Sequence, residues 1–162
     1  AALTIPQISC ELIADNVHVH PAVQKILVDM KSPSGVILIT DAIRAAGLPE
    51  GEYMLDERAV NIQNGAVRLA DGTLAGSILT MERALQNLCS ATGRSLEELW
   101  VTSSLNADPA MGISSRKGSL EVGKDADFVL LDDAFEVQLT VAEGEVLYND
   151  SIPTRPHPNT TH

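Results

Sequence analysis

The order of apolar and polar positions predicts alternating strands and helices in the first quarter of the chain. Residues 8–14 (ISCELIA) mix apolar and β-branched residues in a short run, which is typical of a buried strand. Pro21 is favoured in the first turn of a helix, and helical spacing of the apolar residues after it predicts an amphipathic helix over 21–31. The apolar positions of this helix are Ala22, Val23, Ile26, Leu27 and Met30. Residues 36–40 (VILIT) form an unbroken apolar run, as in a parallel strand covered on both faces.

Turn residues and short helical patterns fill the middle of the chain. Between Gly47 and Gly76, the pairs Asn64-Gly65 and Asp71-Gly72 each separate short alternating segments, which predicts one or two β-hairpins. A helix is expected from about Thr80, with Gly93 as its stop. Its apolar face consists of Met81, Ala84, Leu85 and Leu88.

Two further helix starts follow, and then the pattern changes to strands. Ser95 and Glu98 form a capping box at the start of another helix, and Asp108-Pro109 is a plausible cap for a short turn. From Arg116 onward the pattern is all-β, with a strand over 128–132 and a later turn at Gly144. The proline-rich tail, residues 151–162, is expected to be flexible.

Composition narrows the class of protein. The chain has 162 residues, 44% of them apolar but only 3% aromatic, which favours an α/β interior of aliphatic side chains. The formal net charge of −11 repels a phosphate backbone, so nucleic-acid binding is not expected. A membrane span is not expected either, because no run of 18 apolar residues is present, and we predict a cytoplasmic location. Cys10 and Cys89 have no CxxC spacing and are expected to be reduced, structural thiols.

Candidate chemistry follows each of the two buried strands. His18 and His20 are one residue apart, and on an extended segment both rings would lie on the same side, which suggests a metal site. Such a site needs three or four ligands, and nothing else in the chain is placed to complete the set. Asp41 directly follows the second strand, where it could act in catalysis or simply cap the next turn. Two parallel strands would each need further neighbours, so the chain is interpreted as part of something larger.

Four segments together resemble a known family over most of the chain. They are IADNVHVHP (13–21), ITDAIRAAGLPEGEY (39–53), DGTLAGSILTMERALQNL (71–88) and RKGSLEVGKDADFVLLD (116–132). In order, they are similar to the C-terminal part of the N-acetylglucosamine-6-phosphate deacetylases of the amidohydrolase superfamily. The last segment is typical of many amidohydrolases, whereas the first three are narrower and carry the substrate prediction.

The resemblance implies a fold and a reaction. Residues 1–115 would be the C-terminal part of a (β/α)8 TIM-type barrel of the metal-dependent hydrolases, and 116–150 strands of a small β-sandwich domain. The reaction would convert N-acetylglucosamine 6-phosphate to glucosamine 6-phosphate and acetate, with a divalent ion, zinc or iron, polarising the acetamide and activating water. The metal ligands of the family, a glutamate and two histidines, would lie upstream of this chain.

The resemblance also implies roles for individual residues. Asp41 matches the family's catalytic aspartate, which would act as general base and then general acid. The substrate would be bound by Asp15, Asn16, Val17, His18, Leu74, Ala75 and Gly76. Asn16 replaces the family's usual glycine, and asparagine tolerates a positive φ. His20 has no assigned role in the family and is expected to have a structural or rim role.

Phosphate recognition and the oligomeric state are less directly predicted from this chain. Phosphate recognition needs local donors on so acidic a chain, and Arg44 is the nearest cation that the sequence suggests. The family's phosphate contacts come largely from upstream residues and a neighbouring subunit, which implies a homo-oligomer, a dimer, when the protein is complete. An isolated fragment is expected to be inactive. The alternatives are an amidohydrolase acting on a cyclic amide or an N-acyl amino acid, and a non-catalytic sugar-phosphate-binding or subunit-interaction fragment.

Overall fold

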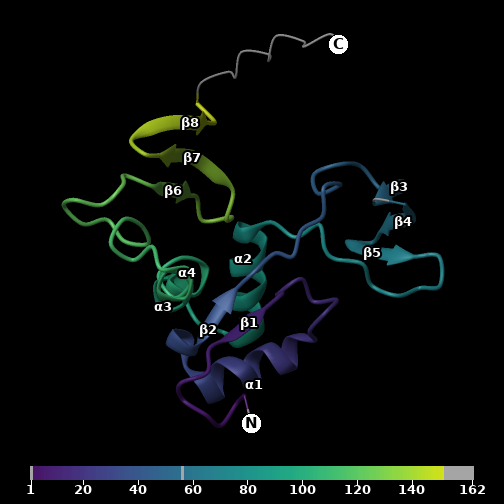
Figure 1. The fold of residues 1–162 in the computed structure, drawn as a ribbon, viewed down its shortest axis with the longest axis horizontal. Coiled ribbons are helices and arrows are strands. Elements are labelled where there is room, and N and C mark those ends of the chain that lie inside the picture. Colours follow the sequence, from purple (N-terminus) through teal and green to yellow (C-terminus); the bar gives the residue numbers. More distant parts are fainter. Residues whose placement is uncertain (1, 56, 152–162) are drawn as a thin grey trace.

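The computed structural model describes residues 2–55 and 57–151, and within them the strands form three separate sheets (Figure 1). A parallel pair lies at the centre, and two antiparallel sheets lie on either side of it in the view of Figure 1. The predicted tail, 151–162, falls outside the described residues except for Ser151.

The central pair is a β-α-β unit. Strand β1 (Cys10–Leu12) pairs in parallel with β2 (Val36–Leu38), and Cys10 lies opposite Val36. Both strands were predicted, but each is shorter than its apolar run. Helix α1 (Pro21–Lys31) and a single 3-10 turn (Pro33–Gly35) connect them, with the predicted helix limits confirmed.

The buried face of α1 differs from the one expected. Val23, Ile26 and Met30 are 52–55% exposed, whereas the buried positions are Gln24, Val28 and Lys31. The reason is that α1 packs on α2 with the face that carries Val28, so the larger apolar residues lie on another side of the helix. The two buried polar side chains are hydrogen-bonded: Lys31 Nζ donates to the Ile5 carbonyl at 2.7 Å, and Gln24 donates within the candidate site.

Helix α2 (Met81–Thr92) closes the main core. It ends at Gly93, which has φ of 72°, and its predicted apolar face is confirmed by the burial of Ala84, Leu85 and Leu88. The core joins this face to both strands of the central pair and to α1. Its buried members are Leu12, Ala14, Val28, Val36, Leu38, Leu79, Ala84, Leu85, Leu88 and Leu99.

The predicted hairpins form a second sheet with a core of its own. Strands β3 (Gly51–Leu55), β4 (Arg58–Gln63) and β5 (Ala66–Leu69) are antiparallel neighbours in that order. Asn64 and Gly65 join β4 to β5 with φ of 52° and 74°, the two positive values of a tight hairpin turn. Ala45, Val60, Ile62 and Val67 are buried together on one face of this sheet.

Short helices lead to the third sheet. The capping box is confirmed at α3 (Leu96–Leu99), which continues into a 3-10 turn (Trp100–Ser103). The expected cap at Asp108 is wrong: α4 (Asp108–Met111) has Ala107 as its N-cap, and the Asp108 side chain is buried. Strands β6 (Phe128–Leu131), β7 (Val137–Ala142) and β8 (Glu145–Asn149) form an antiparallel sheet. Among the described residues, no helix is long and apolar enough to cross a membrane.

Candidate functional site

The parallel pairing of β1 and β2 brings the candidate residues to one edge. Both strands end in the same direction, and the pairing is extended by the Ile39 amide, which donates to the Leu12 carbonyl at 3.0 Å. Residues 13–20 leave the end of β1 and Asp41 follows the end of β2. The segments with His18 and Asp41 therefore start from neighbouring strand ends.

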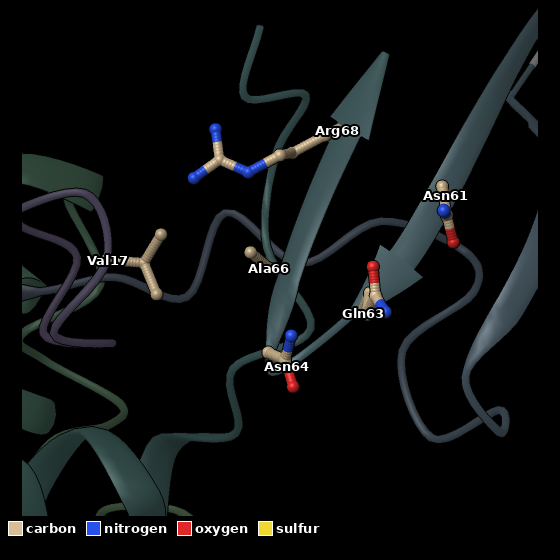
Figure 2. A pocket seen from close by; sticks show the side chains of 6 residues that line it. All are labelled: Val17, Asn61, Gln63, Asn64, Ala66 and Arg68. Atoms are coloured by element: carbon tan, nitrogen blue, oxygen red, sulfur yellow. The ribbon is translucent and has the colours of Figure 1, made fainter. Parts of the chain in front are cut away.

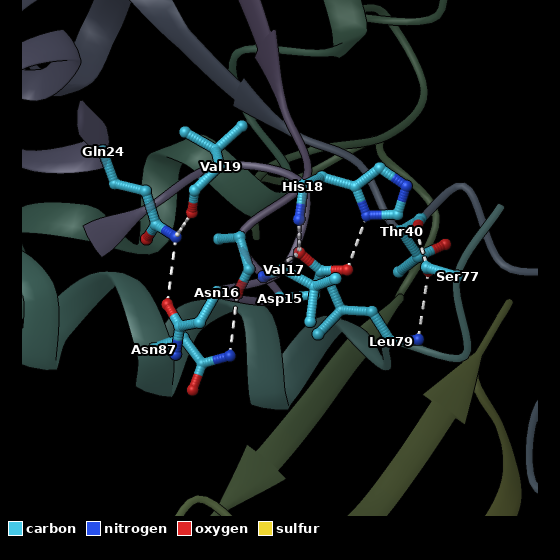
Figure 3. A network of polar contacts seen from close by, with 11 residues as sticks. Asp15, Asn16, Val17, His18, Val19, Gln24, Thr40, Ser77, Leu79 and Asn87 are labelled. Carbon is cyan, nitrogen blue, oxygen red and sulfur yellow. Dashed lines mark hydrogen bonds and ion pairs between the residues drawn. The ribbon is translucent and has the colours of Figure 1, made fainter. Parts of the chain in front are cut away.

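Asp15 organises the loop after β1. Its Oδ1 accepts hydrogen bonds from the amides of Val17 at 2.9 Å and His18 at 2.8 Å. Its Oδ2 lies 2.6 Å from Nδ1 of the His18 ring (Figure 3). A carboxylate at that distance fixes the proton of a neutral ring on Nδ1, so Nε2 is left as an acceptor.

The same contacts determine the charge of Asp15. Its side chain is 6% exposed, and burial acts to raise the pKa of the carboxyl. The His18 amide, the His18 ring and the Val17 amide donate hydrogen bonds that lower it, and the net result is a pKa below the ordinary value. Asp15 is therefore ionised at neutral pH, as its contact with His18 requires.

A buried glutamine anchors the other side of this loop. Gln24 is fully buried on α1, and its Nε2 donates to Asn16 Oδ1 at 3.0 Å and to the Val19 carbonyl at 2.8 Å (Figure 3). Asn16 has φ of 65°, the left-handed conformation that was expected to be tolerated. From α2, Asn87 donates to the Ala14 carbonyl at 2.8 Å. Two helices thus restrain the backbone that carries Asp15 and His18.

Asp41 is exposed and has a left-handed backbone conformation, with φ of 49°. This conformation is uncommon for a residue other than glycine, and such residues concentrate at functional sites. Within the described part of the chain its carboxylate accepts no hydrogen bond. The side chain therefore does not cap the following turn there, which was the alternative to a catalytic role.

Gly76 lies directly against Asp41. A Cβ atom on Gly76 would come within 3.2 Å of the Asp41 carbonyl oxygen and 2.6 Å of Ile43 Cγ2, and the φ of Gly76 is 76°. Ser77 makes the connection: its amide donates to the Asp41 carbonyl at 2.9 Å, and its hydroxyl donates to the Thr40 carbonyl. The predicted loop of Leu74, Ala75 and Gly76 is therefore attached to the strand end that carries Asp41.

The two histidines of the His-x-His pair have different surroundings. His20 is the N-cap of α1, and its Nδ1 accepts a hydrogen bond from the Ala22 amide at 3.2 Å, whereas Nδ1 of His18 contacts Asp15. Among the residues that the structure describes, no group of three or more His, Cys, Asp or Glu side chains is placed to hold a metal ion. Residues 2–55 and 57–151 therefore do not by themselves fit a complete metal site.

A hollow of about 260 Å³ lies between this loop and the second sheet (Figure 2). Val17 lines it from the loop, and polar side chains line it from β4, β5 and the turn between them. The lining residues are Val17, Asn61, Gln63, Asn64, Ala66 and Arg68.

The site residues predicted from the sequence do not include Gln24, Arg68, Ser77 or Asn87. Ser77 stands inside the quoted LAGS segment, but a buried serine that joins two loops gives no signal of its own in one sequence. Gln24 and Asn87 are polar residues within helices and are indistinguishable from solvated ones without coordinates. Arg68 could have been found, because the Asn64-Gly65 turn fixes which residues of β4 and β5 share a face.

Comparison with known proteins decides the family. The sequence profile of the amidohydrolase family matches residues 2–147. The chain belongs to the amidohydrolase family. This amidohydrolase chain is 40% identical over 144 residues to the N-acetylglucosamine-6-phosphate deacetylase of Lysinibacillus sphaericus, and 41% identical over 138 residues to that of Bacillus subtilis. These matches cover 89% and 85% of the chain, but only 37% and 35% of the two relatives.

Solved structures agree in fold. The N-acetylglucosamine-6-phosphate deacetylase of Thermotoga maritima superposes with a TM-score of 0.85 at 38% identity, over 91% of this amidohydrolase chain and 40% of its own. The Mycobacterium smegmatis deacetylase in complex with N-acetyl-D-glucosamine-6-phosphate gives a TM-score of 0.81 at 29% identity, over 90% and 39%. The architecture is thus that of the TIM-barrel amidohydrolases, and the chain spans about two fifths of the length of these structures.

Proposed function

We propose that this chain is the C-terminal part of a deacetylase that hydrolyses N-acetylglucosamine 6-phosphate to glucosamine 6-phosphate and acetate in the cytoplasm. The observation that carries the proposal is the 40% identity to one such deacetylase across 89% of the chain. The Asp15–His18 loop, Asp41 and Gly76 all lie in the matched region.

Asp41 is the proton-transfer group of the proposed reaction. As general base it takes a proton from the water that attacks the acetamide carbonyl, and as general acid it delivers a proton to the nitrogen that leaves as the amine. This role needs an accessible carboxylate within hydrogen-bond reach of the reacting atoms. An exposed Asp41 whose carboxylate has no hydrogen bond in the described part of the chain supports that assignment.

The loop residues orient the sugar. With its proton held on Nδ1 by Asp15, His18 offers Nε2 as an acceptor to a sugar hydroxyl. Asn16 and Val17 shape the same loop, and the backbone of Leu74, Ala75 and Gly76 approaches the ligand beside Asp41. The absence of a Cβ atom on Gly76 allows that close approach.

A divalent ion, zinc or iron, would be held by residues of the complete protein outside this chain and would supply carbonyl polarisation and water activation. We do not propose residues of this chain as its ligands, because the described part of the chain does not bring three suitable side chains together.

The remainder of the barrel would cover surface that is exposed here. Val23, Ile26 and Met30 on α1 are each about half exposed, which is unusual for three large apolar residues of one helix. We propose that an upstream half of the barrel packs against this part of the chain, and that the complete protein is a homodimer.

The test is acetate release by the complete protein from a panel of N-acetylglucosamine 6-phosphate, cyclic amides and N-acyl amino acids. Turnover of the sugar phosphate is expected to exceed that of the other compounds. Preference for an N-acyl amino acid or a cyclic amide would support the alternative amidohydrolase, and binding without turnover would support the non-catalytic alternative. The 162-residue chain alone, with added zinc, is expected to release no acetate.

A further inference from the structure

Ser77 is a buried polar residue where the chain returns from the second sheet to the end of β2. It is 1% exposed, and its hydroxyl donates a hydrogen bond to the Thr40 carbonyl and accepts one from the Leu79 amide at 3.1 Å (Figure 3). A serine hydroxyl has a single donor, so this donor is fully used. The Ser77 side chain therefore has a fixed direction and joins two segments that are 37 residues apart in the sequence.

The backbone of Ser77 is paired with the segment that carries Asp41. The Ser77 amide donates to the Asp41 carbonyl at 2.9 Å, and the Ser77 carbonyl accepts from the Ile43 amide at 2.9 Å. This pairing is an isolated parallel bridge between Ala42 and Ser77. Together with the hydrogen bond from the hydroxyl, it means that one residue contacts the chain before, at and after Asp41.

The hydroxyl and the amide of Ser77 act on the two sides of one backbone torsion. The angle φ of Asp41 describes rotation about its N–Cα bond, with the carbonyl carbon of Thr40 on one side and that of Asp41 on the other. Both of these carbonyl groups accept a hydrogen bond from Ser77. The φ of 49° is left-handed and disfavoured for a residue with a Cβ atom, so it persists only where the surrounding structure imposes it. Ser77 supplies that restraint from both sides.

The place of the Asp41 carboxylate depends on this backbone conformation. Within residues 2–55 and 57–151, no hydrogen bond to the carboxylate holds it from outside. A rotation of φ toward ordinary negative values would swing the side chain away from its present direction. A general base must lie within hydrogen-bond reach of the proton that it takes, and a displacement of about 1 Å can cost about 10²-fold in rate.

We propose that Ser77 is a positioning residue for proton transfer. Its hydroxyl holds the Asp41 backbone in the left-handed conformation, and this conformation aims the carboxylate at the reacting atoms. The inference rests on the proposed function for the role of Asp41. It gives a function to a side chain that directly follows the Leu74, Ala75 and Gly76 loop and is not expected to touch the substrate.

The experiment is a double-mutant cycle on kcat with Ser77→Ala and Asp41→Asn in the complete protein. Ser77→Ala removes the hydroxyl and leaves both backbone hydrogen bonds of residue 77 available. We expect kcat for N-acetylglucosamine 6-phosphate to fall about 10- to 100-fold, with the substrate Kd within about twofold of the wild type. In the Asp41→Asn background the same substitution should change the residual kcat by less than about twofold, because the group that Ser77 positions is gone.

Thr92→Val is the matched control. The Thr92 hydroxyl donates to the Leu88 carbonyl at 2.7 Å and accepts from the Arg94 amide at 3.3 Å, the same pair of hydrogen bonds, but at the C-terminal end of α2. Both variants should lower the thermal unfolding temperature, and only Ser77→Ala should lower kcat. Ser77→Cys retains a weaker donor, so its kcat should lie between those of the wild type and Ser77→Ala, and it takes the place of Ser77→Ala in the cycle if the alanine variant does not fold.

Three results would overturn the proposal. One is an unchanged kcat in the folded Ser77→Ala or Ser77→Cys protein. Another is a loss by the same factor with and without the Asp41 carboxylate, which would assign Ser77 a general structural role. The third is a weaker substrate Kd with no fall in kcat.

A crystal structure of the complete Ser77→Ala protein separates this inference from the proposed function. If the complete wild-type protein hydrolyses no N-acetylglucosamine 6-phosphate, the deacetylase assignment fails, and the backbone of Asp41 then decides the role of Ser77 alone. A φ of Asp41 that leaves the left-handed region in Ser77→Ala would support the restraint by the hydroxyl. A φ that stays near 49° would refute it.

Discussion

Oδ2 of Asp15 lies 2.6 Å from Nδ1 of His18, and Oδ1 of the same carboxylate accepts the His18 amide at 2.8 Å. One side chain thus fixes both the backbone and the ring of the residue three positions later. The ring can turn only by breaking a hydrogen bond to a carboxylate, which is stronger than one between neutral groups.

Replacing Asp15 by asparagine should weaken substrate binding more than it slows chemistry. The amide can donate to Nδ1 of His18, which would move the ring proton to Nε2 and reverse the donor and acceptor that the sugar meets. We expect KM for N-acetylglucosamine 6-phosphate to rise about tenfold or more, with a smaller change in kcat. Asp29→Asn, on the exposed side of α1, is the control and should leave KM unchanged. A normal KM for Asp15→Asn would show that His18 does not depend on this contact.

Acid should remove the stabilisation that Asp15 provides. Its pKa is lowered in the folded protein, so the carboxylate stabilises the fold above its unfolded pKa, and this contribution is lost as pH falls through the lowered value. The difference in thermal unfolding temperature between the wild type and Asp15→Asn should be largest near neutral pH and should shrink below about pH 4, the ordinary aspartate range. A difference that grows toward acid would contradict the ionised assignment.

Gly76 offers a prediction with an internal control. Gly76→Ala introduces a Cβ 2.6 Å from Ile43 Cγ2 and 3.2 Å from the Asp41 carbonyl oxygen, on a backbone with φ of 76°. Gly72→Ala has a similar φ of 86° but no atom within 4 Å of the new Cβ, so it reports the backbone strain alone. Each should cost about 1–2 kcal/mol for the left-handed conformation, and Gly76→Ala should cost more and also lower kcat. Equal effects of the two variants would mean that the contact with Asp41 is unimportant.

Gln24 and Asn16 should be energetically coupled. Gln24→Leu leaves the Asn16 and Val19 oxygens without their donor, and such a loss costs about 1–3 kcal/mol for a buried group. Asn16→Gly keeps the positive φ and removes one of the two acceptors. A double-mutant cycle on the free energy of unfolding should give a coupling of about 0.5–3 kcal/mol. Additive effects would show that Gln24 acts only by filling space.

Sequence patterns predicted the strands and helices well because each carries its own signal. The apolar runs at 8–14 and 36–40 located β1 and β2, and Pro21 and Gly93 marked helix limits that the structure confirms. Strand length was overestimated, since an apolar run continues past the last ladder hydrogen bond into residues that pack without pairing. Parallel pairing then placed the residues after both strands at one edge, which is why His18 and Asp41 could be selected together.

What the sequence could not reveal depends on tertiary packing. The apolar residues of α1 surround more than one side of the helix, and only the position of α2 determines that Val28 is buried while Val23 is exposed. Gln24 and Ser77 act through partners that are 5 to 37 residues distant in sequence, and no local pattern encodes such contacts.

The most direct test of the account is Asp41→Asn in the complete protein, assayed for acetate release from N-acetylglucosamine 6-phosphate and for equilibrium binding of the same substrate. If Asp41 transfers the proton, kcat should fall about 10²- to 10⁴-fold while the substrate Kd stays close to that of the wild type. Near-normal turnover, or a loss of activity that is matched by an equal loss of binding, would contradict the central claim.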